Sequence, residues 1–133
     1  GPDLRSAVSD VSSERAFQRP MAGRHNIAEI ALHHAWYVRV VTGRLTGQET
    51  EPFPTEGEDW FELDADGALS WTEVRSELAA RYAALTQAVA ALGRQSTRSP
   101  LSPAEQLDEV LGITCHAVYH AGQIQLIKRL LAP

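Results

Sequence analysis

Apolar residues recur with helical spacing in three long segments of the chain, and nowhere do they alternate with period two for long. Apolar positions at i, i+3, i+4 and i+7 predict a helix that buries one face, whereas alternation predicts a strand. The three segments extend from about residue 26 to 45, from 70 to 92 and from 103 nearly to the end. The chain is therefore predicted to be all-α.

Each of these segments begins at a residue that commonly caps the N-terminus of a helix. Asn26, with a glutamate three residues later, has the pattern of a capping box. Ser70 is the predicted N-cap of the second long helix, and Gly93 is its predicted end. Ser102, followed by a proline and an early glutamate, is the predicted N-cap of the last helix.

The residues before the first long helix offer much less periodic sequence. A short helix is predicted over residues 3–11, and a second short turn begins at Ser12 and ends by Pro20. Three long helices with one short helix predict an up-and-down four-helix bundle. At 133 residues the chain fits a single domain, residues 1–133, with a short or truncated first helix.

The connection between the first two long helices is unusual in length and composition. Residues 48–70 are rich in Glu, Pro, Gly and Asp, yet include Phe53, Trp60 and Phe61. A segment of this length without periodicity is uncommon inside a compact domain. Its aromatic residues predict that it packs against the bundle as a lid.

Charge and cysteine content narrow the functional classes. A formal net charge of -5 argues against a nucleic-acid partner, because such proteins usually present a basic face. No apolar stretch is long enough for a membrane span, and no signal-peptide pattern opens the chain. Cys115 is the single cysteine; it is expected to be a small buried thiol rather than a nucleophile, in a cytoplasmic protein.

Two histidines in the last helix have the spacing of metal ligands. His116 and His120 are one turn apart, so both imidazoles project from one face of the helix. One helix can offer two nitrogens to a single metal in this way, although both residues could equally be ordinary helix histidines. The pair His33-His34 in the first long helix supplies a third candidate. Helical projection alone favours His34, which lies at the centre of the apolar stripe.

The segments HNIAEIALHHAWY (25–37) and GITCHAVYHAGQI (112–124), together with Asp59-Trp60-Phe61, resemble motifs of the DinB/YfiT-like superfamily. The resemblance covers most of residues 20–130. It implies a four-helix bundle with a divalent metal on three histidines, which are His33, His116 and His120 in this chain. His34 would then be a core histidine or one that orients a ligand. Zinc or nickel is the expected metal, with manganese or iron as alternatives.

The same resemblance implies a class of chemistry. Described members include S-transferases that use low-molecular-weight thiols such as bacillithiol or mycothiol, a related isomerase and a few hydrolases. The expected function is therefore a metal-dependent transferase or hydrolase acting on a small electrophilic substrate, with a low-molecular-weight thiol as a candidate co-substrate. A non-catalytic metal-binding or small-molecule-binding stress protein is the alternative.

Three further polar residues are candidates for orienting a ligand or acting as a base. Glu29 precedes His33 by four residues, Glu109 precedes His116 by seven, and Gln123 follows His120 by three. Either glutamate could equally be a solvated carboxylate.

A homodimer is also expected. The opening residues Gly1 to Leu4 resemble the middle of the family's first helix rather than its start. A short first helix would leave apolar surface that a second copy could cover. The family resemblance also implies pairing.

Overall fold

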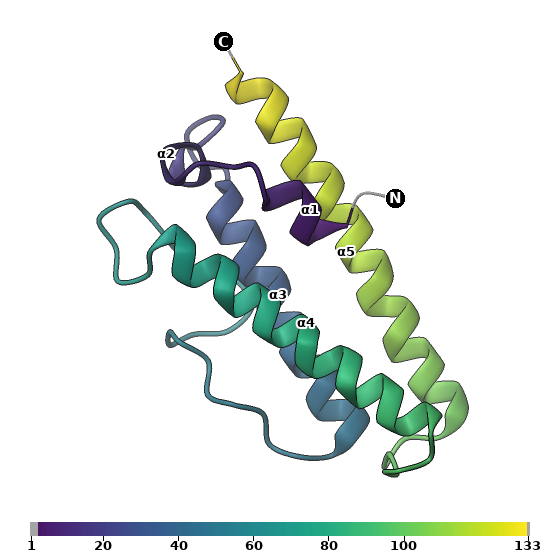
Figure 1. The fold of residues 1–133 in the computed structure, drawn as a ribbon. Helices are drawn as coiled ribbons and strands as arrows, with labels where there is room; N and C mark the ends of the chain where they lie inside the picture. Colours follow the sequence, from purple (N-terminus) through teal and green to yellow (C-terminus); the bar gives the residue numbers. More distant parts are fainter. Residues whose placement is uncertain (1–2, 133) are drawn as a thin grey trace.

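The computed structural model describes residues 3–132 and contains five helices and no strand within that range. Three long helices make up most of the molecule (Figure 1). The prediction of an all-α bundle with a short first helix is confirmed. The helices are α1 (Leu4–Val8), α2 (Ser13–Phe17), α3 (Ile27–Thr46), α4 (Trp71–Gly93) and α5 (Pro103–Leu131).

The three long helices begin at the predicted caps. Asn26, Ser70 and Ser102 each head a complete capping box, in which side chain and backbone satisfy each other's hydrogen bonds. The end of α4 differs from the prediction, because the helix includes Gly93 and its C-cap is Arg94. The left-handed conformation that terminates such a helix falls on Gln95, with φ 58°.

α3 and α4 run in the same direction, and α5 runs opposite to both (Figure 1). At one end Ile27 of α3 shares a core cluster with Trp71 of α4, and at the other Leu45 shares one with Leu85. Consecutive helices are antiparallel in a strict up-and-down bundle. The parallel direction of α3 and α4 therefore departs from the predicted up-and-down topology. A parallel pair needs a connection that returns along a helix of 20 residues, about 30 Å long. This requirement accounts for the long segment between α3 and α4.

The two short helices close one end of the bundle. α1 buries Leu4, Ala7 and Val8 against the core. The ammonium group of Lys128 on α5 donates to the Ala7 carbonyl at 3.1 Å and to the Asp10 carboxylate at 2.7 Å. α1 therefore takes the place of a fourth helix over a part of the bundle only.

The connection between α3 and α4 packs onto the bundle through its aromatic residues, as predicted. Phe61 is buried in the main core cluster, and Phe53 and Trp60 lie against it partly buried. Buried polar contacts also fix the connection, because the Asn26 side chain donates to the Leu63 carbonyl at 2.9 Å. The segment is thus held close to the start of α3.

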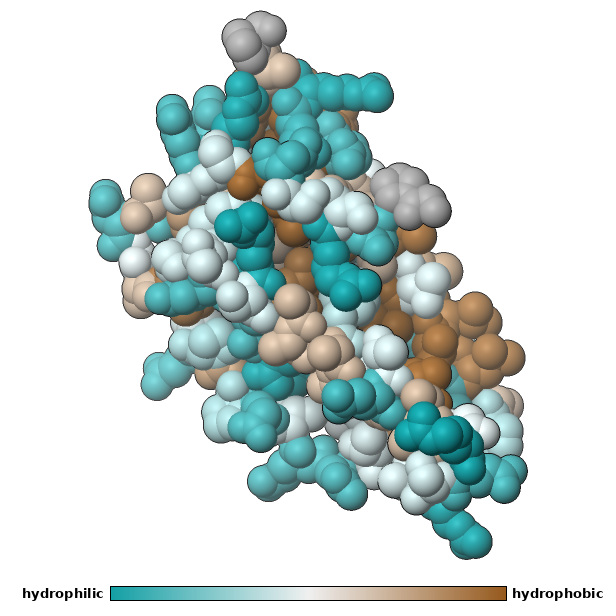
Figure 2. Space-filling model, viewed as in Figure 1, coloured by the Kyte–Doolittle hydropathy of each residue, from teal (hydrophilic) through white to brown (hydrophobic). Residues whose placement is uncertain are grey.

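α5 presents a face of exposed apolar side chains, and hydrophobic residues gather over it in Figure 2. Cys115 lies on α5 and is exposed, so the expectation of a buried thiol was wrong. None of the described helices combines the length and hydropathy that a membrane span requires. The exposed large apolar residues of α5 are Leu107, Leu111, Val118, Tyr119, Leu126 and Leu130.

Candidate metal centre

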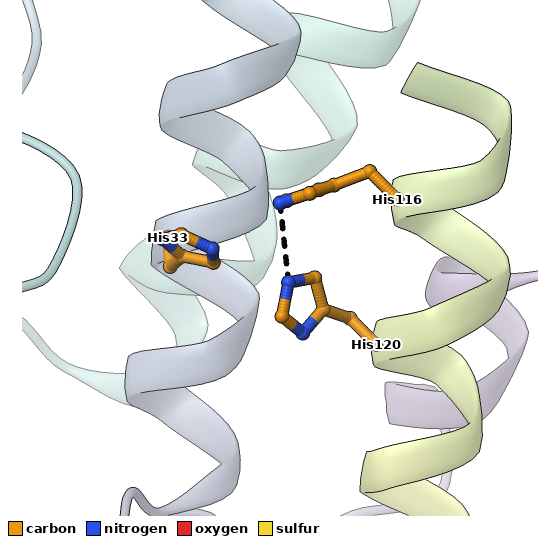
Figure 3. Close-up of side chains that lie close together, drawn as sticks. All are labelled: His33, His116 and His120. Atoms are coloured by element: carbon orange, nitrogen blue, oxygen red, sulfur yellow. Dashed lines mark hydrogen bonds between the residues drawn. The ribbon is translucent and has the colours of Figure 1, made fainter. Parts of the chain in front are cut away.

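Three imidazoles converge in the space between α3 and α5 (Figure 3). His33 comes from α3, and His116 and His120 come from successive turns of α5. One nitrogen from each ring lies within 4.8 Å of the other two, and Nε2 of His116 is 3.1 Å from Nε2 of His120. The antiparallel packing of α5 on α3 thus brings together residues that are far apart in the sequence.

His33 is oriented by the connection between α3 and α4. Its Nδ1 lies 2.7 Å from the backbone carbonyl oxygen of Asp59, which can only accept a hydrogen bond. Nδ1 of His33 therefore carries the proton, and Nε2 presents a lone pair. Asp59 adopts a left-handed φ of 68°, a conformation that Asp tolerates better than most residues. The buried carboxylate oxygen Oδ1 of Asp59 lies 3.2 Å from the same Nδ1, although it meets the geometry of a hydrogen bond with none of the described residues.

The two histidines of α5 are oriented in a similar way. Nδ1 of His120 lies 2.6 Å from Oε1 of Gln123, an acceptor one turn further along the helix. Nδ1 of His116 lies 2.7 Å from Nδ1 of His34. Each of the three rings thus uses Nδ1 for a hydrogen bond, which is how metal-binding histidines are commonly held.

His34 lies behind His116, at the centre of the bundle, and is fully buried. Its second nitrogen, Nε2, forms a hydrogen bond with the hydroxyl group of Tyr82 on α4. If His34 accepts from His116 at Nδ1 and donates to Tyr82 at Nε2, all its polar atoms are satisfied while it is neutral. His34 therefore links α3, α4 and α5 and leaves Nε2 of His116 free.

Burial keeps the imidazoles neutral. It lowers the pKa of His34 to about 3 and that of His116 to about 4, with the neighbouring histidines adding to both effects. Burial also lowers the pKa of His33 and of His120, against the opposing effect of Asp59 and Gln123 respectively. Neutral imidazoles keep the lone pairs that metal coordination requires.

The donor set fits a divalent cation. With Nδ1 protonated on both rings, His116 and His120 direct two lone pairs at each other across 3.1 Å, an arrangement that a cation or a proton relieves. Two nitrogens that bind one tetrahedral ion at about 2.05 Å lie about 3.3 Å apart. Three imidazole nitrogens suit zinc, nickel, iron or copper better than magnesium or calcium, which prefer oxygen.

An aromatic stack covers His33 on one side. The Trp60 indole is parallel to the His33 ring, with centroids 3.8 Å apart, and the His25 ring stacks on the opposite face of Trp60 at 3.8 Å. Tyr37 contacts the edge of His33, with centroids 5.2 Å apart. These rings exclude water from one flank of the cluster and fix the plane of His33.

Glu29 and Glu109, the two glutamates that the spacing suggests, form no hydrogen bond with His33, His116 or His120 among the described residues. The Glu29 carboxylate forms a bidentate ion pair with Arg19 at 2.7 and 2.8 Å and accepts from the backbone N–H of Leu63 at 3.0 Å. Glu109 pairs with Arg44 at 3.4 Å. Of the three polar candidates, Gln123 is the one that contacts a histidine of the cluster.

Asp59 and Tyr82 are the two contacts of the site that sequence reasoning missed. Tyr82 has the spacing of an apolar position in its helix, and nothing in the spacing of α4 relates it to His34. Asp59 belongs to one of the family motifs, but its carbonyl reaches His33 because of a backbone conformation that residue types alone do not specify.

Comparison with protein families gives a match between residues 2–124 and the sequence model of the DinB superfamily. The matched range includes all three histidines of the cluster and the connection that carries Asp59. Comparisons with curated proteins and with solved structures find no match.

Proposed function

The chain belongs to the DinB superfamily, and we propose that it is a small metal-dependent enzyme whose ligands are His33, His116 and His120. The observation that carries this proposal is the convergence of three neutral imidazoles whose Nδ1 atoms are all engaged elsewhere. Zinc or nickel is the proposed metal, since the donor set is entirely nitrogen. The match confirms the superfamily that the sequence motifs predict.

A metal held by three histidines supplies a Lewis acid that lowers the pKa of a bound water or thiol. The residues of this chain supply the rest of the site. Asp59, Gln123 and His34 fix the three rings, and Trp60 excludes water from the flank of His33. Such preorganisation favours reaction at one defined position.

The proposed reaction is the transfer of a low-molecular-weight thiol to a small electrophile, with hydrolysis as the simpler variant. The cluster contains no nucleophilic side chain, and Cys115 is exposed on α5, so an external thiol or water must attack. An exposed lone thiol also supports the proposal of a cytoplasmic protein, because that compartment keeps thiols reduced.

Elemental analysis tests the metal site. Protein purified without a nickel column should carry about one equivalent of a first-row metal. His116→Ala and His120→Ala should each lose it while the helical circular dichroism stays largely intact. His25→Ala is the matched control, because His25 is on the far side of Trp60 from the cluster. Full metal occupancy in both α5 variants would contradict the assignment.

Turnover separates an enzyme from a binding protein. The metal-loaded protein is assayed with a chromogenic electrophile and a panel of thiols, and then with ester substrates that water can cleave. Activity that a chelator abolishes and that the metal restores supports an enzyme. Stoichiometric metal without any turnover would favour a non-catalytic metal-binding protein.

We also propose a homodimer that pairs the exposed apolar face of α5 with its copy. Leu111 and Val118 on this face are 52% and 65% exposed, and a Cβ at Gly122 would meet nothing within 4 Å. A two-fold axis would place this face of one copy against the same face of the other, so that the apolar side chains of both copies become buried. Light scattering at micromolar concentration should give twice 14.6 kDa, and Val118→Glu should give the monomer. A wild-type mass of 14.6 kDa would contradict the dimer.

A further inference from the structure

A groove of about 490 Å³ lies between α3, α4 and the first part of the connection between them. This volume is in the range of small-molecule sites. None of the three histidines of the cluster lines it. Arg39 and Thr42 on α3 line the groove; they follow His33 by six and nine residues, which places them about 240° and 180° around the helix from it. The groove is therefore separate from the metal centre.

Arg39 is the unusual residue of this groove. Its Nε is buried without a hydrogen-bond partner among the described residues, and its Nη1 has a single long contact of 3.4 Å with the Thr50 hydroxyl. The guanidinium group lies over the rings of Trp36 and Phe53, at 5.3 and 5.9 Å from their centroids. Burial, followed by the charge of Arg81, lowers the pKa of Arg39.

The second arginine of the groove is fully engaged by comparison. Arg81 pairs with Glu77 through Nε and donates to the backbone carbonyls of Glu51 and Pro52 at 2.9 Å each. In residues 3–132, no ion pair of this kind forms at Arg39. Arg39 is thus a partly buried cation with a single long hydrogen bond and no ion pair, and a carboxylate matches the planar geometry of its donors.

The other lining residues limit the charge and shape of a ligand. Besides the Arg81–Glu77 ion pair, the groove has two negative and two positive side chains. The acids are Glu49 and Glu51, and the arginines are Arg39 and Arg98. This balance disfavours a dianion such as phosphate. One wall is an apolar stripe of small residues on α4, consisting of Ala80, Ala84, Ala88 and Ala91. A short aliphatic chain can lie along such a stripe without meeting a large side chain.

We propose that this groove binds a small aliphatic monocarboxylate, with its carboxylate on Arg39 and its hydrocarbon chain along the alanines of α4. The carboxylate would bind the Nη atoms of Arg39, which make only the 3.4 Å contact with Thr50 among the described residues, while Nε stays buried beneath them. The ligand would also contact Thr50 and Pro52, in the same connection that carries Asp59 to His33.

Titration with hexanoate, followed by two-dimensional NMR of the full chain, tests the proposal. Hexanoate should shift the amide signals of Thr42, Thr46 and Ala84 in a saturable way. Hexanamide, which has the same chain without the charge, should bind at least about tenfold more weakly, because a charge-assisted hydrogen bond is lost. Inorganic phosphate should not compete with hexanoate.

Two variants and their controls make the result decisive. Arg39→Gln should weaken hexanoate binding about tenfold or more, whereas Arg94→Gln, outside the groove, should not. Ala84→Leu fills the groove from an exposed helix position and should abolish binding with Arg39 intact, whereas Ala83→Leu on another face should not. Absence of hexanoate binding to the wild type, equal binding of hexanamide, or unchanged binding in both groove variants would overturn the proposal.

Discussion

Nδ1 of His34 lies 2.7 Å from Nδ1 of His116, so one of these rings must donate a proton and the other must accept it. The same contact decides which nitrogen His116 offers to the space between α3 and α5. When His116 donates, its Nε2 carries a lone pair directed at the cluster. His34 then carries its proton on Nε2 and donates a hydrogen bond to the hydroxyl of Tyr82. A histidine outside the ligand set thus controls the tautomer of one inside it.

His33→Ala and His34→Ala should separate metal binding from stability. His33→Ala removes a proposed ligand and should abolish stoichiometric metal. His34→Ala should weaken metal affinity only about 10–100-fold, but lower the free energy of unfolding by about 2–4 kcal/mol, because it leaves a cavity and an unpaired Tyr82 hydroxyl. Metal titration and urea unfolding of the metal-free variants measure the two effects. If His34→Ala is the variant without metal and His33→Ala retains it, the third ligand is His34.

Gln123→Ala should weaken metal binding without unfolding the protein. The substitution removes the acceptor at 2.6 Å from Nδ1 of His120, and loss of such a contact typically costs 10- to 100-fold in metal affinity, roughly. Competition with a chromogenic chelator measures the change. Gln125→Ala, two residues further along α5, is the control and should bind metal like the wild type. Equal affinity in both variants would show that Gln123 does not orient the ligand.

Glu29→Gln should destabilise the fold and leave metal affinity nearly unchanged. Burial alone would raise the pKa of Glu29, but hydrogen bonds from Arg19, Leu63 and Asn26 lower it below its usual value. The pair is only half-buried, because Arg19 is 38% exposed and Glu29 1%, so removing the charge should cost about 1–3 kcal/mol. Chemical denaturation measures this loss, with the exposed Glu56→Gln as the control. A large loss of metal affinity with intact stability would instead make Glu29 part of the site.

The metal-free protein should lose stability as the pH falls below 6.5. Well above that pH, His33, His34, His116 and His120 are neutral in both the folded and the unfolded chain, so they add no pH dependence. Below it, the unfolded chain binds protons that the folded protein excludes, until the pH reaches about 4 for His116 and about 3 for His34. The free energy of unfolding therefore decreases with falling pH in this window.

Urea unfolding of the metal-free protein at pH 7.5 and pH 5 checks this prediction. The lower limit of pH 5 stays above 4.5, the ordinary pKa of Glu29, and the pKa in the folded protein is lower still, so Glu29 contributes little in this window. His34→Leu should show a shallower pH dependence than the wild type. An unchanged slope in this variant would mean that His34 is not the buried group responsible.

The parts of the fold that depend on local sequence could be predicted. The capping boxes at Asn26, Ser70 and Ser102 depend on residues three positions apart, and each occurs where the sequence indicates. The one-turn spacing of His116 and His120 is also a local property. Projection correctly placed His34 at the centre of the apolar stripe, since it is fully buried.

The remaining features depend on contacts between distant segments. The parallel direction of α3 and α4 follows from the path of a connection that has no periodicity to reveal it. The spacing of Glu29 from His33 makes it a candidate for the metal site, but its carboxylate is bound by Arg19, which lies ten residues earlier in an irregular segment. Single-sequence reasoning has no means of placing such a partner.

The separation of His33 from His116 and His120 along the chain has a consequence for how the protein reaches its folded state. A metal ion shared by these residues would join positions roughly 80 residues apart, and the unfolded chain would have to lose conformational entropy to bring them together. Binding energy would then count toward folding, since the unfolded chain presents its histidines far apart. Metal would therefore raise the free energy of unfolding of a chain that also folds without it, by an amount that grows with the metal concentration.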